Sequence, residues 1–211
     1  MKNLLFVICI IFIISSCGNN KQEKETVKDT DKVVTVPTPI PDLLVVQDSV
    51  KAIGEQILIS LKENNFAELR KYFSEDGVLF SPYGYIDIAT SKKLTPDDFI
   101  TAVNKKWILT WGNYDGTGDL IKLTVTDYLK KFVYNADYVN AEAIGFDEVM
   151  KQGNSVNNLK EIYPNCHFID YHFSGFDQKL KGLDWTSLRL VIEKQNGEYF
   201  LVAVIHDQWT I

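Results

Sequence analysis

The 211-residue sequence has only three cysteines, at positions 9, 17 and 166, and this scarcity limits how the fold is held together. Because the first two stand at the start of the chain in an export-type segment, Cys166 is the only thiol expected in the folded domain. One thiol makes no internal disulfide, so the fold must depend on its hydrophobic core. Cys166 itself lies among apolar residues in NCHFIDY, which predicts a buried, inert thiol.

Positive charge is also scarce, since 22 Lys and Arg residues face 28 Asp and Glu residues. Without a basic patch the chain is not expected to bind nucleic acid. Several signatures of catalysis are missing too: the spacing of zinc ligands, a phosphate-binding glycine loop and a serine-centred nucleophile motif. The sequence therefore predicts neither a bound metal nor a cofactor.

Long hydrophobic runs are absent except at the beginning, where residues 4–14 read LLFVICIIFII. This run follows Lys2 and precedes Ser15 and Ser16, an order typical of a secretory signal. It is shorter than the ~17 to 25 apolar residues that a membrane-spanning helix needs. Residues 1–16 are thus predicted to be a signal peptide and not part of the fold.

The residues Ile14-Ser15-Ser16-Cys17 resemble the bacterial lipobox, in which an aliphatic residue and two small residues precede the lipid-modified cysteine. The resemblance implies cleavage before Cys17, lipid on that residue, and anchoring of the protein to a membrane of the bacterial cell envelope, facing the periplasm or the surface. The alternative is an ordinary signal peptide that is cleaved elsewhere.

Residues 17–46 differ in composition from the rest of the chain. The stretch GNNKQEKETVKDTDK is polar and mixed in charge, and VVTVPTPIPDLL contains three of the six prolines. A segment this poor in apolar residues cannot offset the entropy of folding, and the spaced prolines favour an extended backbone. We expect a flexible tether here, followed by a single domain over residues 47–211.

Within that domain, helical patterns come first. Apolar residues recur at helical spacing from Val50 to Leu61, and a short second helix is predicted over residues 66–73. An extended segment follows from Gly77 through SPYGYIDI. Thr95-Pro96-Asp97-Asp98 predicts the start of a helix that continues to Trp107. A glycine-rich loop, WGNYDGTGDL, then leads to another helix around residues 126–134.

The second half of the domain is predicted to be mainly strands. Residues 166–173 alternate between two faces, with Asp170 and His172 on the same one, and residues 141–149 suggest a further strand. Two β-rich runs, 188–193 and 199–205, are joined by Asn196-Gly197, the preferred dipeptide of a type I′ hairpin. Helices followed by an antiparallel meander predict an α+β fold, with N-terminal helices packed on a curved, mainly antiparallel sheet.

Two stretches resemble the NTF2-like (SnoaL-type) cone fold. They are the opening KAIGEQILISLKENNFAELRKYFSEDGVLFSP and the closing hairpin SLRLVIEKQNGEYFLVAVIHDQWTI. The chain is also similar to uncharacterised bacterial lipoproteins that have segments like SPYGY, WGNYDGTG, DWTSLRL and HDQWTI. The cone fold implies a pocket formed by the concave sheet face and its open end. It implies no particular activity, since such domains include enzymes, binding modules and scaffolds.

The candidates for catalysis are two histidine–carboxylate pairs, Asp170 with His172 and His206 with Asp207, together with Arg189. A histidine beside a carboxylate can act as an acid or a base near neutral pH. Such pairs also occur as satisfied polar groups on sheets, and this interpretation is favoured here. Convergence of the candidates in one cavity would favour an enzyme.

The candidates for ligand binding are the aromatic residues Tyr83, Tyr85, Trp111 and Tyr114, although core packing explains aromatic residues equally well. The loop from Asn113 to Gly118 partly matches a calcium-binding loop, but Thr124 stands where the bidentate Glu should be. Trp209, close to the end of the chain, is expected to pack into the domain.

The sequence thus leaves two functional hypotheses. The favoured one is a membrane-tethered module, not an enzyme, that binds an unknown small molecule or a protein. The alternative is a cofactor-free isomerase or hydrolase that uses a histidine in the cone pocket.

Overall fold

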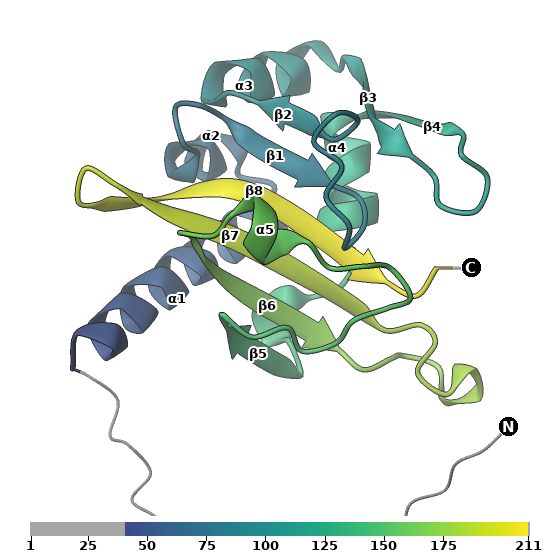
Figure 1. Ribbon diagram of the computed structural model, residues 1–211. Helices are drawn as coiled ribbons and strands as arrows, with labels where there is room; N and C mark the ends of the chain where they lie inside the picture. Colours follow the sequence, from purple (N-terminus) through teal and green to yellow (C-terminus); the bar gives the residue numbers. More distant parts are fainter. Residues whose placement is uncertain (1–40, 211) are drawn as a thin grey trace, which may run out of the picture. The chain divides into compact units, whose positions relative to one another are not determined.

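Helix α1, Pro41–Lys62, opens the part of the chain that the computed structural model describes, residues 41–210 (Figure 1). The predicted signal peptide, Cys17 and residues 17–40 of the tether lie outside it. The helix begins six residues earlier than the predicted boundary at Gln47, which corrects the extent of the tether. Pro41 suits a first helical turn because no N–H is needed there, and Asp42 favours the positive end of the helix dipole.

A six-stranded sheet with the order β2-β1-β8-β7-β6-β5 forms the centre of the domain. Its neighbouring strands are antiparallel except β1 and β8, which run parallel. The strands are β1 (Val78–Ser81), β2 (Lys92–Leu94), β5 (Ala143–Phe146), β6 (His167–Phe173), β7 (Thr186–Gln195) and β8 (Glu198–Gln208).

The remaining elements are short helices and one separate ribbon. The ribbon pairs β3 (Ile108–Asn113) with β4 (Leu120–Thr124). The α-helices after α1 are α2 (Phe66–Leu69), α3 (Pro96–Lys105), α4 (Val125–Tyr128) and α5 (Leu159–Ile162), and the other helical turns are η1 (Arg70–Tyr72), η2 (Leu129–Val133), η3 (Tyr138–Asn140) and η4 (Gln178–Leu180). The predicted α+β class with a mainly antiparallel sheet is confirmed. None of the helices between residues 41 and 210 is long and apolar enough to cross a lipid bilayer.

The hairpin between β7 and β8 is confirmed in its details. Asn196 and Gly197 both have positive φ angles, of 52° and 91°, and they join strands that pair from Gln195 and Glu198 onward. A type I′ turn requires this conformation at both central positions. The strand after the turn also runs three residues beyond the predicted end, to Gln208.

The region after α3 differs from the prediction. The helix ends at Lys105 because Lys106 adopts the left-handed conformation, with a φ of 53°, so Trp107 lies outside the helix and is half-exposed. The predicted glycine-rich loop is only the tip of the β3–β4 ribbon. Strand-forming residues on both sides of the glycines outweigh the loop-forming tendency of the glycines themselves.

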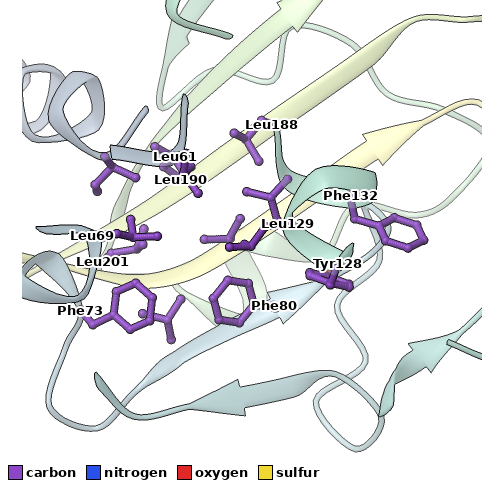
Figure 2. Packing of buried hydrophobic residues seen from close by; sticks show 14 of the residues in the cluster. Leu61, Leu69, Phe73, Phe80, Tyr128, Leu129, Phe132, Leu188, Leu190 and Leu201 are labelled. Carbon is purple, nitrogen blue, oxygen red and sulfur yellow. The ribbon is translucent and has the colours of Figure 1, made fainter. Parts of the chain in front are cut away.

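Both faces of the central sheet are covered by apolar side chains. The larger cluster lies between the helices and one face, and Figure 2 shows Leu61, Leu69, Phe80, Tyr128 and Leu188 meeting there. A smaller cluster, which includes Phe168, Val191, Ile205 and Leu159, covers the other face. Because β6, β7 and β8 are buried on both sides, polar residues on these strands lie inside the protein.

Candidate functional site

Arg189, at the centre of β7, holds two carboxylates on neighbouring strands. Its Nε donates to Asp170 Oδ2 on β6 at 3.0 Å, and its Nη2 donates to Asp207 Oδ2 on β8 at 2.9 Å. The same Nη2 also donates to the backbone oxygen of Lys151 at 2.8 Å. Arg189 and Asp170 are completely buried. Burial raises the pKa of both carboxyls, and the Arg189 charge acts in the opposite direction.

His172 lies on the same face as this cluster and bonds to a serine. Its Nδ1 is 2.9 Å from Ser187 Oγ, and burial lowers the pKa of its imidazole. A serine next to a histidine can serve as a nucleophile if a substrate reaches it. Ser187 is completely buried, so no substrate has access to its hydroxyl in this arrangement.

His206 points to the opposite face of the sheet. Its Nδ1 is 3.1 Å from the backbone oxygen of Pro82, its Nε2 is 3.0 Å from Thr186 Oγ1, and the Phe132 ring lies against it. Complete burial lowers the pKa of His206 to about 4. The five catalytic candidates therefore do not converge, because His206 is separated by the sheet from Asp170, His172, Arg189 and Asp207.

Two neighbouring hollows lie where the chain leaves β1 and β8. These strands are parallel, so their carboxyl ends meet at one edge of the sheet. The hollows have volumes of about 400 and 460 Å³ and share a wall made by Tyr83 and Asp115. We call them the strand-end hollows. The first is lined by Ser81, Pro82, Tyr83, Tyr85, Asp87, Thr90, Ser91, Gly112, Asn113, Asp115 and Ser155, and the second by Tyr83, Asp115, Gly116, Thr117, Gln208, Trp209 and Thr210.

The walls of the hollows are fixed by hydrogen bonds between distant segments. Asn158 bonds through its side chain to both the N–H and the carbonyl oxygen of Ile86, at 2.8 and 3.0 Å. Asn154 donates to the backbone oxygen of Thr210. A Cβ added at Gly84 would lie within 3 Å of the Asp207 carboxylate, so glycine allows the SPYGY turn to approach the buried ion cluster.

The predicted ligand-binding residues divide into two pairs. Tyr83 and Tyr85 line the first hollow, and the Tyr83 hydroxyl accepts the Asp115 N–H at 3.2 Å. Trp111 lies in the core instead, where it stacks on Tyr128 with ring centroids 3.9 Å apart. Tyr114 is half-buried and packs on Phe132, and it is absent from the lining of the hollows. Trp111 is buried because its side chain is on the face of β3 that points into the core.

Comparisons with known proteins give only distant structural likenesses. No family model matches the chain, and no curated protein matches it. Among solved structures, it is similar to an NTF2-like protein of unknown function from Shewanella oneidensis MR-1, at 8% identity and a TM-score of 0.34, over 76% of this chain and 98% of that chain. It is also similar to a provisionally assigned ketosteroid isomerase from Shewanella frigidimarina NCIMB 400, at 14% identity and a TM-score of 0.31, over 75% and 94%. At TM-scores this low, neither likeness carries a conclusion about the architecture or the chemistry of this chain.

The position of Trp209 is the clearest correction near the hollows. It was expected to pack into the domain, but 45% of its surface is exposed and it lines the second hollow. The reason is that β8 ends at Gln208, so the alternation of the strand no longer directs the next side chain inward. No signal in the sequence places this indole beside SPYGY and WGNYDG, because both segments lie far earlier in the chain.

The loop that resembles a calcium site folds back on itself. Asn113 Nδ2 donates to the backbone oxygen of Gly118 at 2.6 Å, which closes the loop. Over residues 41–210 there is no group of three or more His, Cys, Asp or Glu side chains that could hold a metal ion. Cys166 is buried, and burial raises the pKa of its thiol to about 11. This environment disfavours the thiolate that nucleophilic attack requires.

Proposed function

We propose that this chain is a lipid-anchored module of a bacterial cell envelope that binds a small molecule in the strand-end hollows. The observation that carries the proposal is the pair of adjacent hollows at the parallel ends of β1 and β8, with volumes of about 400 and 460 Å³. Small-molecule sites commonly have volumes of ~300 to 1,000 Å³ and combine aromatic walls with a few polar groups.

Two exposed aromatic rings support binding at this place. Tyr85 is 52% exposed and Trp209 is 45% exposed, although each lines a hollow. Aromatic side chains supply large contact areas when a partner covers them. A ligand in the hollows would bury apolar surface that the free protein leaves in contact with water.

The enzyme hypothesis receives less support from the same geometry. The linings of the hollows include no histidine, cysteine, lysine or arginine. His172 and His206, the residues expected to exchange protons, are both buried, on opposite faces of the sheet. General acid–base catalysis needs a group within hydrogen-bonding reach of the substrate. The hollows therefore suit binding better than proton transfer.

Replacing the exposed rings should weaken ligand binding without unfolding the domain. We expect Tyr85→Ala and Trp209→Ala each to change the free energy of unfolding by less than about 1 kcal/mol, because neither ring is buried. Each should weaken by at least about tenfold the binding of those compounds, from a set of sugars, amines and organic acids, that the unmodified protein binds in isothermal titration calorimetry. Trp107→Ala is the matched control, since Trp107 is 46% exposed but lines neither hollow. An equal loss of ligand affinity in all three variants would contradict the assignment of the binding site to the hollows.

The membrane anchor is tested at Cys17. We expect Cys17→Ser to leave the protein without lipid, so that it moves from the detergent phase to the aqueous phase in phase-partitioning experiments and incorporates no labelled fatty acid. Cys166→Ser is the control, because a lipid-modified residue must lie in the lipobox-like segment. Retention of the Cys17→Ser protein in the detergent phase would reject the lipid anchor.

A further inference from the structure

The hydrogen-bonding groups of the strand-end hollows show which ligands they suit. Their charged side chains are Asp87 and Asp115, and no basic residue is among the lining. An ionised carboxylate only accepts hydrogen bonds, so a complementary ligand must donate them. The neutral polar side chains of the lining fall into two sets. Ser81, Asn113, Thr117 and Thr210 already make hydrogen bonds within the protein, whereas Thr90, Ser91, Ser155 and Gln208 leave their side-chain groups available to a ligand.

Anionic ligands are disfavoured at this place. The lining contains two carboxylates and no basic side chain, and the whole chain has a formal net charge of −6. Lys131, whose charge acts on Tyr83, lies outside the lining. A carboxylate, phosphate or sulfate group would lose its water without gaining a cation. The ligand is therefore either neutral or positively charged.

A neutral ligand fits better than a cation. Asp87 and Asp115 are both exposed, and the Asp87 carboxylate already accepts the Ala89 N–H at 3.0 Å. Ion pairs at exposed positions add little, because water screens the charges. The hydroxyl and amide groups that are not used within the protein, those of Thr90, Ser91, Ser155 and Gln208, suit instead a ligand with several donors and acceptors.

The aromatic walls add a requirement on shape. Tyr85 and Trp209 each present about half of their surface to solvent, and Tyr83 lies in the wall between the two hollows. Flat apolar rings are best covered by a ligand that has an apolar face of similar size. A saccharide ring meets both needs, since its C–H face is apolar and its hydroxyl groups lie around the edge.

We propose that the strand-end hollows bind neutral, hydroxyl-rich ring compounds of the saccharide class and reject anions. This inference rests on the proposed function, because it names the ligand class of the same site.

The test uses the fluorescence of Trp209 in the full chain carrying Trp107→Phe. Trp111 and Trp185 are buried, so Trp209 is then the tryptophan that a ligand in the hollows can cover. The probes are methyl glucoside and maltose as neutral rings, choline as a cation and citrate as an anion. We expect the two sugars to reduce acrylamide quenching at concentrations up to about 10 mM, equally at low and high salt, and citrate to have no effect.

A second variant separates hydrogen bonding from charge. Asp115→Asn should weaken sugar binding by no more than about threefold, because the amide oxygen still accepts a hydrogen bond and water already screens the carboxylate charge, and the salt independence of binding should be retained. Asp119→Asn is the control, since this neighbouring acid lies outside the lining. Stronger binding of choline or citrate than of either sugar would overturn the saccharide proposal while supporting the hollows as a binding site. Protection by none of the four probes would overturn the saccharide proposal, and the proposed function would then depend on the wider set of compounds in the calorimetric test.

Discussion

Replacing Arg189 with methionine should lower the free energy of unfolding by about 3 to 5 kcal/mol, measured by urea denaturation at neutral pH. The change removes the cation from a buried cluster in which Asp170 and Asp207 both bond to the guanidinium. Methionine fills similar space, so a cavity is not the main cause. The cost arises because two buried carboxylates lose their partner.

The same substitution at an exposed arginine shows whether burial causes the large loss of stability in Arg189→Met. Arg70 also pairs with an aspartate, Asp97, at 3.4 Å, but both side chains are exposed. We expect Arg70→Met to cost less than about 1 kcal/mol, as exposed ion pairs contribute little. A triple variant, Asp170→Asn/Arg189→Met/Asp207→Asn, should recover part of the loss by removing the unpaired charges.

The loss in Arg189→Met should depend on pH in a defined direction. Burial raises the pKa of Asp170 and Asp207, and without the arginine these values must rise further. A carboxyl whose pKa is higher in the folded state than in the unfolded state stabilises the fold fully at pH values below its unfolded pKa of ~4. This stabilising free energy is lost as the pH rises through the pKa of the folded state. The difference in the free energy of unfolding between wild type and Arg189→Met should therefore become smaller as the pH falls from 7 to about 5. A constant difference would contradict our explanation.

Local sequence rules predicted much of the fold because each relevant signal acts over a few residues. Asn196-Gly197 needs only its own turn geometry, and the alternation over residues 166–173 correctly separates the two faces of β6. The β3–β4 ribbon was missed since its glycines are typical of a loop. The parallel pairing of β1 with β8 was also beyond reach, because it joins residues more than 100 positions apart.

The candidate site was harder to predict from the sequence than the fold. Asp170 and His172 were correctly placed on one face of a strand, but nothing in the sequence showed that both faces of this sheet are covered. That covering turns an apparent histidine–carboxylate site into a buried polar cluster. The hollows involve four segments distant in sequence, so neither Asp87 nor Trp209 could be assigned to them from spacing alone.

The pH dependence of stability should also reveal the buried His206. Its imidazole is neutral in the fold because burial lowers its pKa to about 4, whereas an unfolded histidine titrates near ~6.5. A group with a lowered folded-state pKa contributes stability that is present above the unfolded value and is lost as pH falls towards the folded value. With each pH unit worth about 1.4 kcal/mol, the loss between pH 7 and pH 4 amounts to about 3 kcal/mol.

Substitution of His206 by glutamine isolates this contribution from those of the buried carboxyls, which remain in both proteins. The stability difference between wild type and His206→Gln should therefore fall by about 3 kcal/mol from pH 7 to pH 4. Val204→Ala, a change at a buried residue two positions earlier in β8, should lower the free energy of unfolding by an amount that does not change with pH, because neither side chain titrates. If the curves for wild type and His206→Gln run parallel, His206 is not held neutral by burial. The contacts of its ring with Thr186 and Pro82 would then have to open to water in the folded protein.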